Sequence, residues 1–148
     1  MQNSQLKGVF SLAGLEDMDL KNTIMNTLDI KIIEYTKERV IASMPVTSKV
    51  HQPFGIMHGG VSLVLAETVA SSGSYQFIDF PAKSAVGLEI NANHVRSVAA
   101  GIIKAVGTPV HIGRTTHVWD VRIYDEQERL TCISRCTIAI IDNPAKTE

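Results

Sequence analysis

A long and almost uncharged segment in the middle of the chain constrains the fold most strongly. Between Val50 and Ile78 the only acidic or basic residue is Glu67, with histidines counted as neutral. Residues 50–57 hold a proline and a glycine and predict a loop. Over residues 58–77, apolar side chains occupy every side of a helical wheel, which is typical of a buried helix. At a rise of 1.5 Å per residue, this helix is about 30 Å long and crosses a small domain.

Alternating apolar and polar residues predict β-strands on both sides of this helix. Strands are expected over residues 30–35, 39–46, 86–93, 101–110, 115–124 and 130–141. A short first helix is expected within residues 15–28. This order predicts an α+β domain in which a six-stranded antiparallel sheet wraps around one long central helix.

The strand after the central helix has the clearest alternation. Every second residue from Val86 to Ala92 is apolar, and these side chains are expected on one face. The pattern reverses at His94, which predicts a β-bulge near Asn93.

Length and charge exclude several classes of function. The 148 residues predict one domain, over residues 1–148. With 14 basic and 15 acidic residues there is no excess of positive charge for nucleic acid or an anionic membrane. No apolar run spans a membrane and the N-terminus is a poor signal peptide, so a cytoplasmic protein is expected. Cys132 and Cys136 would share a strand face but lie too far apart for a disulfide, and no metal-ligand spacing occurs.

Glu67 is the first candidate for chemistry. It lies near the middle of the apolar helix, and no lysine or arginine lies within eleven residues on either side. A buried carboxylate without a partner is unfavourable. Glu67 therefore either faces solvent or a distant arginine, or it serves as a general base or nucleophile.

The His58-Gly59-Gly60 sequence is the second candidate. Two adjacent glycines are unfavourable inside a helix but suit its N-terminus, where free N–H groups can stabilise an oxyanion. The alternative is a flexible entry turn. Gly59 precedes Glu67 by eight residues, so one face of the helix could hold both groups.

Other polar residues could contact a ligand. Ser71 lies one helical turn after Glu67 and contacts either a substrate or a backbone carbonyl. Gln52 offers a neutral donor in the preceding loop. A small phosphate patch, or alternatively a solvated strand end, is expected from four residues: His94, Arg96, Lys104 and Arg114.

Several of these motifs together resemble a known family. Gln52-Pro53-Phe54-Gly55, His58-Gly59-Gly60 and Ala66-Glu67 with Ser71 resemble hotdog-fold acyl-CoA thioesterases that carry a catalytic glutamate on the central helix, among them the phenylacetate-pathway and one 4-hydroxybenzoyl-CoA type. The sequence GLEINANHVRS over residues 87–97 is similar to the 1,4-dihydroxy-2-naphthoyl-CoA thioesterases of menaquinone biosynthesis and their enterobactin-proofreading relatives. The resemblance runs from about Leu28 to Ile141.

The resemblance implies an assembly as well as a fold. The sheet and the central helix would form the hotdog fold, two sheets would join edge to edge in a dimer, and two dimers would form a homotetramer. Active sites would lie at the dimer interface. The strand that carries Asn91 and Asn93 would be the pairing edge.

The resemblance also implies roles for individual residues. Gly59 N–H and Gln52 would contact the thioester carbonyl, His58 would orient this region, and Glu67 of the partner subunit would attack the carbonyl or activate water. Substrate contacts would come from Ser71, Thr68 and Gly60. The phosphates of coenzyme A would be bound by His94, Arg96, Arg114 and Thr115; close relatives carry Ser-Arg after the glycine that Gly113 matches, so which residue meets phosphate stays open.

The expected function is hydrolysis of an acyl-CoA thioester, with an aromatic acyl group, to the free acid and coenzyme A, without a cofactor or metal. Tyr75, Phe77 and Phe80 either line the acyl pocket or belong to the core. One alternative is a broad-specificity thioesterase for aliphatic or carrier-protein thioesters. Another is a non-catalytic acyl-CoA-binding module. A 3-hydroxyacyl dehydratase is disfavoured, because it needs a histidine beside the substrate carbon and His58 precedes the helix.

Overall fold

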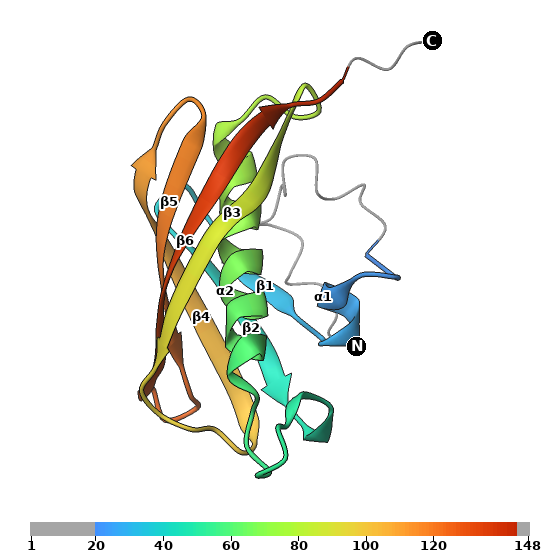
Figure 1. The fold of residues 1–148 in the computed structure, drawn as a ribbon, viewed down its shortest axis with the longest axis vertical. Coiled ribbons are helices and arrows are strands. Elements are labelled where there is room, and N and C mark those ends of the chain that lie inside the picture. The colour runs from blue at the N-terminus through green and yellow to red at the C-terminus, as the bar shows by residue number, and fades with distance from the viewer. Residues whose placement is uncertain (1–19, 145–148) are drawn as a thin grey trace, which may run out of the picture.

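A six-stranded antiparallel sheet wraps around one long helix (Figure 1). The computed structural model describes residues 20–144. The elements in chain order are α1 (Ile24–Thr27), β1 (Lys31–Tyr35), β2 (Val40–Val46), η1 (Ser48–Val50), α2 (Gly59–Ser74), η2 (Tyr75–Phe77), β3 (Lys83–His94), β4 (Gly101–Ile112), β5 (Thr116–Tyr124) and β6 (Leu130–Asp142). The strand order β1-β2-β4-β5-β6-β3 leaves β1 and β3 at the two edges. The predicted α+β layout is confirmed.

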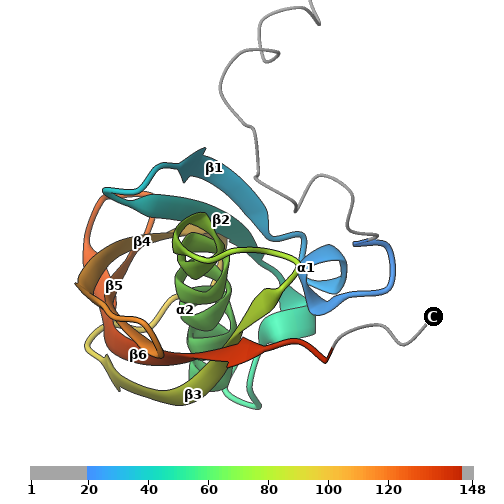
Figure 2. The ribbon, with the colours of Figure 1, turned by 90° about the horizontal axis from the view of Figure 1, so that it is seen from above.

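The core lies between α2 and the concave face of the sheet. Figure 2 shows the sheet curving around α2, with α1 on the open side. Four α2 side chains are fully buried against the sheet: Leu65, Ala66, Val69 and Ala70. Burying each large apolar side chain stabilises the fold by about 1.5–3 kcal/mol. The opposite side of α2 is only partly covered, so the helix is central but not enclosed on all sides.

Two side-chain hydrogen bonds fix the C-terminal half of α2. The indole Nε1 of Trp119 donates to Ser74 Oγ at 2.9 Å, and the Tyr35 hydroxyl donates to the Ser72 carbonyl at 2.9 Å. Because both bonds are buried, they set the rotation of the helix relative to the sheet.

The first predicted helix is much shorter than expected. Of its described residues, 20–28, only Ile24–Thr27 are helical, and residues 15–19 lie outside the described residues. Thr23 caps the helix through its hydroxyl, and Asp29 then adopts a left-handed backbone conformation with φ of 53°. The local turns on both sides therefore limit α1 to one helical turn.

The β-bulge lies in β3 but not where the sequence predicts it. Pairing with β6 is regular from Glu89 to His94, and the register shifts between Gly87 and Glu89. Leu88 is the extra residue. From Glu89 onward, each side chain therefore lies on the face opposite to the one that regular alternation from Gly87 would give. Val86 and Leu88 are 40% and 66% exposed, and their predicted place on the same face as Ile90 and Ala92 is wrong.

The polar residue that suggested a bulge near Asn93 has another explanation. His94 pairs with the buried Cys132 and lies on the same face as Ile90 and Ala92, which are partly buried and pack against the core. A polar side chain is tolerated there because the core gives way to a cavity at this end of the strand.

The two edges of the sheet differ in length and in protection. β1 has five residues, contains a register shift between Ile32 and Glu34, and is flanked by an Arg39–Glu34 ion pair. β3 has twelve residues. A long edge strand presents many unpaired backbone groups to another chain, whereas a short edge strand presents few.

The structure also bears on the two cysteines and on membrane-spanning helices. Cys132 and Cys136 do not bond to each other, as predicted, and both are buried. Within residues 20–144 no helix has the length and apolar character needed to span a membrane.

Candidate functional site

The N-terminus of α2 is built around His58. Its Nδ1 accepts a hydrogen bond from Gly60 N–H at 2.9 Å, and its carbonyl accepts one from Val61 N–H at 3.0 Å. Gly59 N–H has no hydrogen-bond partner in the part of the chain that the structure describes. The first N–H at the positive end of the helix is therefore available to a ligand oxygen.

A cavity of about 370 Å³ lies at this end of α2, and we name it the Gly59 cavity. Its lining includes polar groups from the loop before the helix, from α2, and from the end of β3 onward: Gln52, Gly59, Ser62, His94, Arg96 and Thr131. Gln52 Oε1 accepts the Phe54 N–H at 2.9 Å, which leaves the amide nitrogen of Gln52 as a donor. The loop therefore fixes which end of the Gln52 amide a ligand can meet.

Gly59 and His94 are closely packed. A Cβ atom added to Gly59 would lie 2.7 Å from His94 Nε2 and 3.0 Å from His94 Cδ2. Only glycine therefore fits at residue 59 with the imidazole in this place. The His94 ring therefore occupies the space beside Gly59 that a side chain would need.

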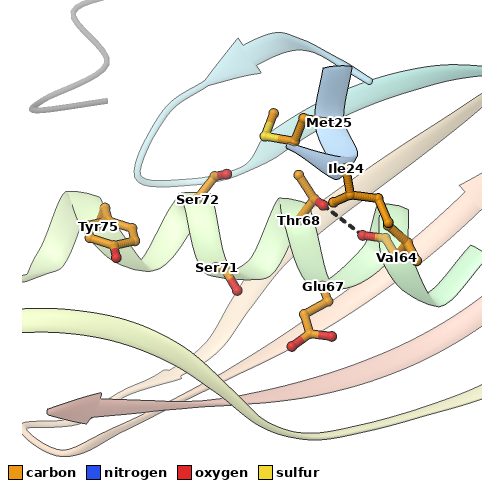
Figure 3. Close-up of a pocket in the computed structure, with 8 residues that line it drawn as sticks. All are labelled: Ile24, Met25, Val64, Glu67, Thr68, Ser71, Ser72 and Tyr75. Carbon is orange, nitrogen blue, oxygen red and sulfur yellow. Dashed lines mark hydrogen bonds between the residues drawn. The ribbon is translucent and has the colours of Figure 1, made fainter. Parts of the chain in front are cut away.

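A second cavity, of about 390 Å³, lies on the open side of α2 and includes Glu67 in its lining (Figure 3), and we name it the Glu67 cavity. It is lined mainly by α1 and α2, through Ile24, Met25, Val64, Glu67, Thr68, Ser71, Ser72 and Tyr75. Glu67 and Ser71 point toward the same side of the helix. Glu67 is half-buried, and its carboxylate has no hydrogen bond or ion pair within residues 20–144.

The hydroxyl groups of the Glu67 cavity are not equivalent. Thr68 Oγ1 donates to the Val64 carbonyl at 2.7 Å, so its proton is already used (Figure 3). Ser71 makes no hydrogen bond to any other described residue through its side chain. Ser71 is therefore the free hydroxyl one turn from Glu67.

The aromatic residues after α2 divide between the cavity and the core. Tyr75 lines the Glu67 cavity. Phe77 packs edge-on against His117 at 5.9 Å between ring centroids, and Phe80 packs edge-on against Tyr75 at 5.6 Å. Of the three aromatic candidates, only Tyr75 lines this cavity.

Gly59 and Glu67 lie on the same helix but in different cavities. Eight residues at 1.5 Å each separate them by about 12 Å along the axis. A carbonyl group is too short to accept a hydrogen bond from Gly59 N–H while Glu67 of the same chain reaches its carbon. Within one chain these two groups therefore cannot act on the same carbonyl group.

The predicted phosphate patch is likewise divided. His94 and Arg96 line the Gly59 cavity, whereas Arg114 and Thr115 lie in the turn between β4 and β5. The twelve residues of β4 separate the two ends of the sheet by about 40 Å. Lys104 forms an ion pair with Glu128 at 2.7 Å. The structure therefore does not bring the patch together within one chain.

Sequence reasoning missed the contribution of α1. Ile24 and Met25 form one wall of the Glu67 cavity, and no motif marks them as ligand contacts. Within the described range 20–144, no three His, Cys, Asp or Glu side chains lie close enough to bind a metal ion.

Comparisons with known proteins agree with this geometry. The family model described as Thioesterase superfamily matches residues 54–132. A 1,4-dihydroxy-2-naphthoyl-CoA hydrolase of Listeria monocytogenes is 50% identical over 79% of this chain and 94% of its own, and one of Escherichia coli is 44% identical over 82% and 88%. The crystal structure of a mutant of thioesterase PA1618 from Pseudomonas aeruginosa has a TM-score of 0.84 and 42% identity, covering 93% of this chain and 98% of that one. The chain therefore belongs to the thioesterase superfamily and is a hotdog-fold thioester hydrolase.

Proposed function

We propose that the protein hydrolyses aromatic acyl-CoA thioesters at sites assembled from two subunits. The observation that carries this proposal is the separation of Gly59 and Glu67 into two cavities of one chain. Each cavity holds one half of the groups that thioester hydrolysis needs. A second copy of the chain supplies the half that the first one lacks.

The open edge of the sheet offers a way to join the halves. Antiparallel pairing of two β3 strands sets the His94 end of one chain beside the Lys83 end of its partner. The Gly59 cavity then faces Glu67 of the partner subunit. The same pairing moves Arg114 and Thr115 of the partner subunit toward His94 and Arg96. Two such dimers would form the homotetramer.

The chemistry follows from the two halves. The thioester carbonyl accepts hydrogen bonds from Gly59 N–H and the Gln52 amide, and these stabilise the developing oxyanion. Glu67 of the partner subunit attacks the carbonyl carbon, or it removes a proton from an attacking water. In either case the C–S bond breaks and coenzyme A leaves as a thiolate. When water attacks, the acyl group with the water oxygen is the free acid, and the proton held by Glu67 passes to the thiolate. When Glu67 attacks, the acyl group is first bonded to the carboxylate as an anhydride, and water then hydrolyses that bond, which releases the free acid, restores the Glu67 carboxylate and supplies a proton to the thiolate.

The lining of the Glu67 cavity supports an aromatic acyl group. Its walls include Val64, Met25 and Tyr75, and the free hydroxyl of Ser71 suits a hydroxyl substituent on an aromatic ring. Relatives named 1,4-dihydroxy-2-naphthoyl-CoA hydrolase support the same choice. This activity would place the enzyme in the cytoplasm, in menaquinone biosynthesis.

The test measures thiol release from benzoyl-, hydroxybenzoyl-, hydroxynaphthoyl-, phenylacetyl- and aliphatic-CoA. Replacing Glu67 with glutamine removes the base or nucleophile and should lower kcat by about 10²–10⁴. The matched control is Glu38→Gln, the same change at an exposed residue between β1 and β2, and it should keep wild-type activity. Hydroxylated aromatic thioesters should be the best substrates.

Three outcomes would contradict parts of this proposal. Wild-type activity in Glu67→Gln would remove Glu67 from the mechanism. A preference for aliphatic thioesters would overturn the aromatic assignment. Failure to hydrolyse any CoA thioester, with turnover of a carrier-protein thioester instead, would overturn the assignment of coenzyme A.

A further inference from the structure

We propose that Gly87 is a positioning residue that holds the Glu67 carboxylate in its reactive place. This inference rests on the proposed role of Glu67. A Cβ atom built on Gly87 would collide with Glu67 Oε1 and would lie 2.9 Å from Glu67 Cδ. The carboxylate therefore occupies the space that a side chain at residue 87 would fill.

Packing alone sets the position of this carboxylate. Glu67 has no hydrogen bond or ion pair within residues 20–144, so no directional contact with the described chain orients it. The group nearest to the place of a Gly87 side chain is the carboxylate itself, so Glu67 is directed at β3.

The bulge at Leu88 makes this arrangement possible. In a regular strand, Ala85, Gly87 and Glu89 would all face α2. The extra residue turns Glu89 to the exposed face, where its carboxylate accepts a hydrogen bond from Asn91 Nδ2 at 3.2 Å. The bulge therefore keeps a second carboxylate away from Glu67, and Gly87 is the last residue before the shift that faces the helix.

A methyl group at residue 87 should displace the carboxylate without unfolding the chain. The atoms that it meets belong to the end of a flexible side chain, so rotation of Glu67 relieves the collision. A misplacement of about 1 Å in a reacting group can lower a rate by about 10². The Gly59 cavity, where coenzyme A is proposed to bind, does not include Gly87.

The experiment compares kcat and KM for Gly87→Ala with those for Val86→Ala, a change at the adjacent β3 position whose side chain lies on the opposite face. We expect Gly87→Ala to lower kcat by about 10- to 100-fold with KM changed less than about threefold. Val86→Ala should keep kcat within about twofold. Circular dichroism and oligomeric state should match wild type in both. Wild-type kcat in Gly87→Ala would overturn the proposal.

A double substitution tests whether Gly87 acts through Glu67. In a Glu67→Gln background, adding Gly87→Ala should lower kcat no further, because the group that Gly87 positions has already been removed. A further loss equal to that of Gly87→Ala alone would overturn the proposal. If Gly87→Ala does not fold, Glu67→Ala/Gly87→Ala should restore the thermal unfolding midpoint, and failure to restore it would equally overturn the proposal.

These results also separate this inference from the proposed function. Loss of activity in Glu67→Gln together with full activity in Gly87→Ala would remove only the role of Gly87. Full activity in Glu67→Gln would remove the catalytic role of Glu67, and the inference about Gly87 with it.

Discussion

The two cavities along α2 differ in what they offer a substrate. The Gly59 cavity presents a free backbone N–H, the Gln52 amide and the cationic Arg96. The Glu67 cavity presents apolar walls, one carboxylate and the Ser71 hydroxyl. Groups that stabilise negative charge are thus kept about 12 Å from the group that carries it. Because of this separation, the hydrogen-bond donors of the Gly59 cavity do not pair with Glu67 of the same chain.

Mixing two inactive variants tests whether each active site combines one cavity from each subunit, and it has the largest expected change in activity. Glu67→Gln damages one cavity and Gln52→Ala the other, and each homodimer should lose most of its activity. Random exchange at equal amounts makes half of the dimers mixed, and one of the two sites in each mixed dimer is intact. Activity should therefore recover to about a quarter of the wild-type value.

Thiol release before and after subunit exchange measures this recovery, and differently tagged subunits verify that mixed dimers form. If mixed dimers form and activity does not recover, both halves of the site lie in one chain.

Arg96→Ala should affect binding in the Gly59 cavity and leave chemistry near Glu67 intact. A charge-assisted hydrogen bond to phosphate should be lost, so KM for acyl-CoA should rise about tenfold with kcat nearly unchanged. The KM difference should shrink at high salt, because ions screen exposed charges. Arg122→Ala, at an exposed β5 residue paired with Asp120, serves as the control. A loss in kcat alone would contradict the assignment of Arg96 to binding.

Much of the fold could be predicted from the sequence, because helix and strand periodicities are local. The eight-residue spacing between Gly59 and Glu67 follows directly from the sequence as well. The bulge was misplaced because a polar His94 on the inner face depends on a cavity, which is a tertiary feature. Met25 as a cavity wall and His94 against Gly59 arise from packing between distant segments. Local patterns do not encode such contacts.

Ser71→Ala and Thr68→Val compare the two hydroxyl groups of the Glu67 cavity. Loss of one neutral hydrogen bond of about 1 kcal/mol should lower kcat/KM for a hydroxylated aromatic thioester about fivefold relative to its unsubstituted analogue. Thr68→Val should change this ratio less, because the Thr68 hydroxyl already donates to Val64. Paired assays of hydroxybenzoyl- and benzoyl-CoA measure the ratio. An equal effect of both substitutions would show that Ser71 has no special contact.

His117 lies outside both cavities, and its expected effect is on stability and not on activity. Burial lowers the pKa of its imidazole from the ordinary value of 6.5. The unfolded chain therefore takes up a proton below pH 6.5 that the folded chain resists, so stability is lost as the pH falls, by at most about 1.4 kcal/mol per pH unit. His117→Phe should flatten this dependence in urea unfolding at pH 5.5 and 7.5. Identical slopes in both proteins would contradict the prediction.

The unequal edges of the sheet also determine how far the protein can polymerise. A sheet with two long open edges can add chains without end, which is the geometry of a fibril. Here β1 has five residues and β3 has twelve, so β3 is much the longer template for strand addition. Once two β3 strands have paired, both outer edges are β1, and growth by strand addition stops at two chains.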